Sequence, residues 1–83
     1  MSMPPAPVAL IAEALGCAES SLAEDSRLGN HPNWDSVGHL SVMLALEQHY
    51  GVEITDETIR RYDNVAAIRA RYTDMTRRSA LTE

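Results

Sequence analysis

The chain has 83 residues, of which 45% are hydrophobic, so it is long enough for one small domain with a single modest core. Aromatic residues make up only 5%, with no Phe, and a core of aliphatic side chains favours helices over sheets. The net charge of −5 disfavours nucleic-acid binding, and a single cysteine excludes an internal disulfide. No apolar run approaches the length of a membrane span, and an N-terminus without Lys or Arg disfavours a signal peptide. We therefore expect a cytoplasmic protein.

The first helix is predicted over residues 7–15. Pro7 suits the first turn of a helix, and Val8, Ile11 and Leu15 recur on one face, so these three are expected in the core. Gly16 then supplies a C-terminal stop.

Residues 17–34 form a long connection for so small a domain. Leu22, Leu28 and Trp34 are spaced along it, and we expect them to pin the connection to the core. A helical turn is possible near residues 20–24.

The strongest helix is predicted over residues 36–50, because Asp35 or Ser36 can cap its start and Gly51 can close it. At the helical period of 3.6 residues, one face is apolar and is expected to be buried. This face holds Val42, Met43, Leu46 and Tyr50.

A second face of the same helix mixes apolar and polar side chains: Ser36, Val37, Leu40, Leu44 and Glu47. A domain this small has difficulty burying both faces of one helix. We therefore expect Leu44 to serve in docking and Val37 and Leu40 to be partly buried.

Two further helices complete the chain. A short one opens after Thr55 and ends near Arg61, and a fourth begins around Asp63. Residues 76–83 are expected to be frayed. The buried stripe of the fourth helix holds Val65, Ile68 and Tyr72.

The predicted fold is therefore all-α: a small four-helix bundle with a long loop between the first two helices and a short third helix. We expect a single domain over residues 1–83 with an ordered core of about residues 7–75.

Ser36 is the strongest candidate for chemistry. A hydroxyl in the first turn of a helix is most often a cap. The same position also suits a phosphate group, because unpaired N–H groups and the positive end of the helix dipole stabilise an anion there.

Residues 34–40 read WDSVGHL, residues 45–47 read ALE and residues 50–54 read YGVEI. In this register they resemble the centre of an acyl carrier protein. In that family an Asp-Ser-Leu motif opens the second helix, and its serine carries 4′-phosphopantetheine. The resemblance implies that Ser36 holds this covalent cofactor; Val37 stands where the family usually has Leu.

The resemblance further implies a monomeric carrier, not an enzyme, that holds an acyl or aminoacyl group as a thioester. Its partners would be a phosphopantetheinyl transferase, a ligase or transferase that loads the cargo, and downstream biosynthetic enzymes. We expect the partner surface to comprise Asp35, Val37, Leu40, Leu44 and Glu47. Ser41 and Gln48 stand where acids are common in the family, so recognition should depend less on charge.

Other readings stay open at this point. Ser36 and His39 are three residues apart and could form a hydrolase pair, but no further acid beyond Asp35 is near to orient the histidine. Asp35 and His39 could also form a surface ion pair. The three histidines, His31, His39 and His49, lack metal-ligand spacing. A helical interaction module without a prosthetic group is the main alternative.

Overall fold

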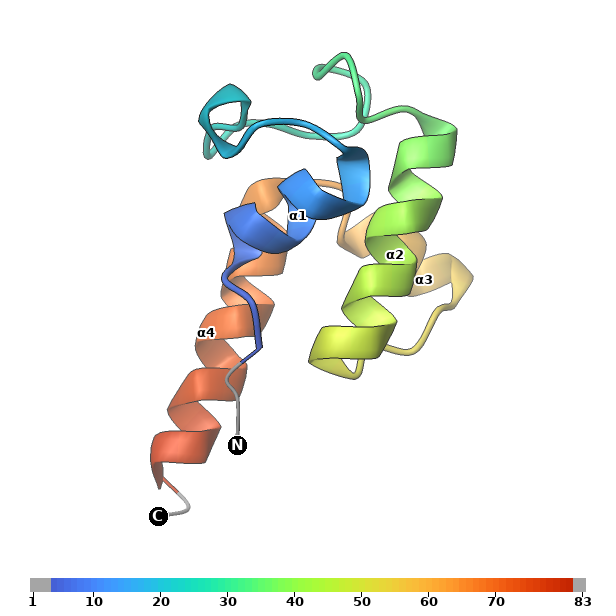
Figure 1. The fold of residues 1–83 in the computed structure, drawn as a ribbon. Helices are drawn as coiled ribbons and strands as arrows, with labels where there is room; N and C mark the ends of the chain where they lie inside the picture. Colours follow the sequence, from blue (N-terminus) through green and yellow to red (C-terminus); the bar gives the residue numbers. More distant parts are fainter. Residues whose placement is uncertain (1–3, 82–83) are drawn as a thin grey trace.

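The computed structural model of the protein describes residues 4–81 (Figure 1). In chain order the elements are α1 (Pro7–Leu15), the 3₁₀ turn η1 (Glu19–Ser21), α2 (Ser36–Tyr50), α3 (Asp56–Arg61) and α4 (Val65–Leu81). Between residues 4 and 81 there is no β-strand, and a single antiparallel bridge joins Arg27 to Asn64. The all-α prediction, the long first loop and the short third helix are confirmed.

The helix boundaries follow from local chemistry. Gly16 and Gly51 end α1 and α2 in the left-handed conformation, with φ of 70° and 66°, which glycine adopts without steric cost. Asp35 caps α2 with its carboxylate, Thr55 forms a capping box at α3, and the Asn64 amide oxygen accepts the Ala67 N–H at the start of α4 (2.7 Å).

The fourth helix differs from its prediction. It begins at Val65 and continues to Leu81, so the expectation of fraying from residue 76 was wrong up to residue 81; residues 82 and 83 lie outside the described residues. Arg, Ala and Leu near its end are good helix formers. An ion pair one turn apart, from Arg78 to Asp74 at 3.3 Å, also supports these turns.

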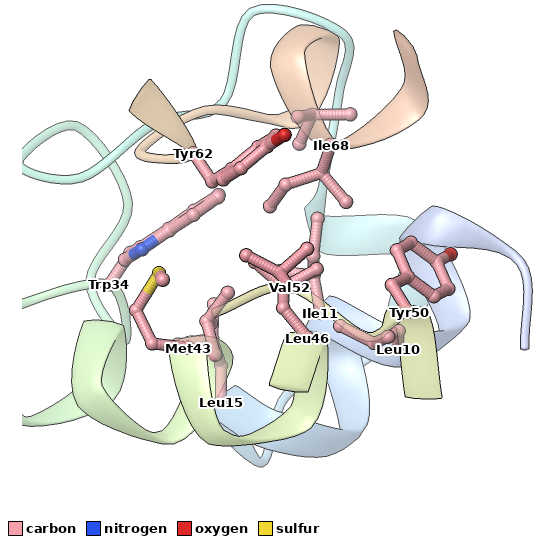
Figure 2. Close-up of a cluster of buried hydrophobic side chains, with 12 residues drawn as sticks. Leu10, Ile11, Leu15, Trp34, Met43, Leu46, Tyr50, Val52, Tyr62 and Ile68 are labelled. Carbon is pink, nitrogen blue, oxygen red and sulfur yellow. The ribbon is translucent and has the colours of Figure 1, made fainter. Parts of the chain in front are cut away.

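The helices surround one core. In Figure 1, α1 lies between α4 and α2, α3 lies beside α2, and the first loop passes over one end of the molecule. Figure 2 shows the buried side chains that converge from these elements. The apolar core residues are Leu10, Ile11, Ala12, Leu15, Trp34, Val42, Met43, Leu46, Tyr50, Val52, Tyr62, Val65 and Ile68. The predicted buried face of α2 is thereby confirmed, whereas Val8 is only half-buried at the edge of this core.

The long loop is tied to the core as predicted. Trp34 is completely buried and points toward Met43 and Tyr62 (Figure 2), while Leu22 and Leu28 are half-buried against the core. The loop backbone also bonds to the α3–α4 connection, since the Leu28 N–H donates to the Asp63 carbonyl at 2.8 Å. The helical turn in this loop is η1, slightly earlier than residues 20–24.

Candidate functional site

Ser36 is the first residue of α2, and its side chain is exposed. Of the two candidate caps, Asp35 takes the role: its Oδ1 accepts the Gly38 N–H at 2.8 Å. The N–H groups of Ser36 and Val37 have no hydrogen-bond partner among the described residues. An exposed hydroxyl beside two free N–H groups at a helix N-terminus fits a phosphodiester on the Ser36 oxygen.

Gly38 lies two residues after Ser36, where the start of α2 packs closely against the loop and the end of α1. A Cβ atom at this position would lie 2.3 Å from the Asn33 carbonyl oxygen and 2.8 Å from Leu15 Cδ2, so only glycine fits without movement of the backbone. The Asn33 side chain also donates to the Leu15 carbonyl at 3.1 Å, at the end of α1. The sequence pattern assigns no role to Gly38; the structural reason for glycine at this position is this close approach.

His39 does not pair with Asp35, so the surface ion pair that their spacing would allow does not form. Its ring is buried, with 4% of the residue exposed. The Trp34 indole N–H donates to His39 Nδ1 at 3.0 Å, and His39 Nε2 lies 2.7 Å from the Ile59 carbonyl oxygen in α3. Trp34 was the feature of the sequence that could have indicated this role for His39, because a buried indole N–H needs a hydrogen-bond acceptor.

This arrangement removes the hydrolase reading. A general base must reach the hydroxyl that it activates. Both ring nitrogens of His39 are engaged inside the protein, whereas Ser36 faces solvent. The histidine in the loop, His31, bonds to the Ser21 hydroxyl and accepts the Asn33 N–H. Neither histidine can therefore serve Ser36 as a base.

The second face of α2 is more exposed than predicted. Val37, Leu40 and Leu44 are 76%, 56% and 51% exposed, so the partial burial expected for Val37 and Leu40 was wrong. More than half of each of these three residues is therefore in contact with solvent. Asp35, the N-cap residue of α2, and Glu47 near the other end of the helix are also exposed. We call the five residues the exposed stripe.

Among residues 4–78, the exposed stripe holds every large hydrophobic side chain that is exposed. Val37, Leu40 and Leu44 are separated by three and four positions and therefore line one side of the helix. Such a concentration beside one exposed serine is typical of an interaction surface.

Residues 8–71 match the family model described as "Phosphopantetheine attachment site". An acyl carrier protein from Buchnera aphidicola subsp. Baizongia pistaciae (strain Bp) is 32% identical over 59 residues, which cover 71% of this chain and 76% of that protein. The chain therefore belongs to the acyl carrier protein family.

Membership defines what the protein is: a carrier that bears 4′-phosphopantetheine and is not itself an enzyme. Such carriers act together with a phosphopantetheinyl transferase and with biosynthetic enzymes. Within residues 4–81, no helix is long and apolar enough to cross a membrane.

Proposed function

We propose that Ser36 is the residue that carries the phosphopantetheine, and that the protein delivers an acyl or aminoacyl group bound to it as a thioester. The observation that carries this proposal is the position of Ser36: an exposed hydroxyl at the first turn of α2, beside two N–H groups without protein partners. Its motif, Asp35-Ser36-Val37, is also the one that resembles the family's attachment sequence.

The protein's part in this chemistry is placement. A Mg²⁺-dependent transferase would transfer phosphopantetheine from coenzyme A to the Ser36 oxygen: the pyrophosphate bond of coenzyme A breaks, and adenosine 3′,5′-bisphosphate and the hydroxyl proton leave. The thiol of the cofactor would then hold the cargo. A flexible arm fixed to one point gives its cargo a high effective concentration at enzymes that bind the carrier. Because Ser36 faces solvent, nothing in the described residues blocks the arm from leaving the surface.

The test is intact-mass analysis after incubation with coenzyme A and a broad-specificity transferase. We expect the wild type to gain the mass of one phosphopantetheine and Ser36→Ala to gain none. Ser41→Ala, on the same helix, is the matched control and should be modified like the wild type. Equal modification of Ser36→Ala would overturn the assignment.

The exposed stripe supports a second part of the proposal, that partner enzymes dock along α2. An enzyme that receives the arm must approach the protein near Ser36, and the stripe begins there. Its apolar centre would supply most of the affinity, while Asp35 and Glu47 would guide approach to basic groups on the partner. The partners would be the transferase, a loading ligase or transferase, and the downstream enzymes.

The same proposal includes a monomeric carrier in the cytoplasm. It also includes a single four-helix-bundle domain over residues 1–83 with a core of about residues 7–75. These points rest on the sequence and on the family. The alternative, an interaction module without a prosthetic group, is not favoured, because the matched family is defined by phosphopantetheine attachment.

A further inference from the structure

The hydrogen bond between Trp34 and His39 spans Ser36. The two residues are five positions apart, and the bond from the indole N–H to Nδ1 is buried and 3.0 Å long. Between them, the His39 N–H donates to the Asp35 carbonyl at 2.7 Å. The residues on both sides of Ser36 are thus held from inside the protein, although its own side chain is free.

The other nitrogen of His39 connects this turn to α3. Nε2 lies 2.7 Å from the Ile59 carbonyl oxygen. No residue of α3 is fully buried, and Ile59 is half-buried against the core. His39 lies about one helical turn after Ser36, so its bond holds α3 beside the attachment site.

Only one form of the imidazole satisfies both bonds. An indole N–H can only donate, so Nδ1 must accept and carries no proton. The proton then resides on Nε2, which donates to the Ile59 carbonyl. An imidazolium has no acceptor for Trp34, and an aliphatic side chain would leave the buried indole N–H and the partly buried carbonyl without these hydrogen bonds. Packing alone therefore does not account for a histidine at this position.

We propose that His39, as the uncharged Nε2–H imidazole, is a positioning residue for phosphopantetheine attachment: its bond to Trp34 sets the turn that presents Ser36, and its bond to Ile59 sets α3 beside it. This inference rests on the proposed function of Ser36. A transferase must align the Ser36 oxygen with the phosphate that it transfers, and small displacements of a reacting atom slow such steps strongly.

Two substitutions separate the two bonds. His39→Gln places an amide N–H near the position of Nε2, so it keeps the bond to Ile59 and loses the bond to Trp34. His39→Asn places an amide oxygen near Nδ1, so it keeps the acceptor for Trp34 and loses Ile59. Trp34→Phe removes the indole donor and retains an aromatic ring. His49→Gln, an exposed position on the same helix, is the matched control.

The measurement is the steady-state kinetics of Ser36 modification by a broad-specificity transferase, at a temperature where circular dichroism shows each variant folded. We expect His39→Gln and Trp34→Phe to lower kcat about tenfold, equivalent to one lost hydrogen bond. His39→Asn should mainly raise KM, because α3 shifts on the surface that the transferase covers. His49→Gln should match the wild type.

Nitrogen-15 NMR of the wild-type histidines tests the same proposal without a substitution, and we expect a protonated Nε2 and an unprotonated Nδ1 for His39. A protonated Nδ1 would overturn the proposal, as would folded His39 and Trp34 variants that are modified at the wild-type rate. If the wild type itself is not modified, the proposed function fails and this role fails with it. If the wild type is modified and the variants match it, only the positioning role is lost.

Discussion

The two apolar stripes of α2 differ in solvent exposure: one is buried and the other is exposed. Val42, Leu46 and Tyr50 are at most 2% exposed, whereas Val37, Leu40 and Leu44 are 51% exposed or more. Both stripes consist of ordinary hydrophobic side chains on the same helix, and they differ in what lies opposite them. The first packs against α1, α4 and the buried end of the loop (Figure 2). The second is exposed to solvent.

Because of this difference, one side of α2 contributes to the stability of the fold and the other side is left for the proposed recognition of partners. The buried stripe removes apolar area from water and contributes to folding, whereas the exposed stripe leaves its apolar area in solvent, where the proposed partners would bind. Ser36 lies at the start of the exposed side, and His39 and Gly38 connect this start to the core. Substitutions along α2 should therefore divide into those that unfold the domain and those that disable it while folded.

The largest effect on stability is expected from Leu46→Ala in the buried stripe. Leu46 is 0% exposed, so its truncation leaves a cavity and should cost about 2–5 kcal/mol. Chemical denaturation of this variant beside Leu44→Ala tests the comparison with one chemical change at two positions. Leu44→Ala should cost less than about 1 kcal/mol. Equal costs at the two positions would contradict the assignment of the faces.

Gly38→Ala should also destabilise the protein, by about 1–3 kcal/mol. Helix propensity alone predicts the opposite sign, since Ala is favoured over Gly within a helix by about 1 kcal/mol. The overlap with the Asn33 carbonyl should dominate, because a Cβ 2.3 Å from a backbone oxygen requires the loop to move. Thermal unfolding decides between the two, with Val37→Ala as an exposed control. A raised melting temperature for Gly38→Ala would show that the loop at Asn33 moves easily to accommodate the added Cβ.

A smaller and pH-dependent effect is expected at Tyr50. Its hydroxyl donates to the Pro5 carbonyl at 2.7 Å, so Tyr50→Phe should cost about 1 kcal/mol near neutral pH. Burial, and then the nearby Tyr72, raise the pKa of the Tyr50 hydroxyl above its ordinary value of 10.0, while Arg69 lowers it. The folded state therefore favours the protonated phenol.

The direction of the pH effect follows from this preference. The contribution of Tyr50 to stability is fully present below pH 10.0 and is lost as the pH rises from there through the higher pKa of the folded state. Denaturation curves at a series of alkaline pH values should show a steeper loss for the wild type than for Tyr50→Phe. Parallel losses would show that Tyr50 does not contribute.

The smallest effect on stability is expected from Leu44→Arg, within about 0.5 kcal/mol. The same variant, carrying phosphopantetheine, should be loaded much more slowly by the proposed ligase, because a charge replaces the apolar contact proposed for the exposed stripe. Glu47→Arg should lower loading less and mainly at low salt, where charge steering is strongest.

The control for added positive charge is Glu53→Arg, since Glu53 is exposed but lies outside the exposed stripe. We expect Glu53→Arg to be loaded at the rate of the wild-type protein. A collapse of the melting temperature of Leu44→Arg would instead place Leu44 in the core.

Much of the fold was predictable because its signals are local. Proline at the start of α1, glycine after α1 and α2, and the threonine cap of α3 act within a few residues of the boundary that they set. Ser36 stood out for the same reason, since its motif and its place at a helix start are both contained in neighbouring residues. The fourth helix was predicted too short, because its last turns carry no apolar stripe to signal them.

The residues whose roles were missed depend on partners distant in the chain. His39 is buried because Trp34 donates to one nitrogen and Ile59, twenty positions later, accepts from the other. Gly38 must be glycine because Asn33 and the end of α1 pack against it. Helical periodicity identified the two apolar stripes on α2 and which of them is buried, but the high exposure of Val37 and Leu40 follows only from the tertiary packing, in which α1, the loop and α4 cover the other stripe. Local chemistry determines where helices begin and end, whereas burial depends on contacts between segments that the linear pattern does not contain.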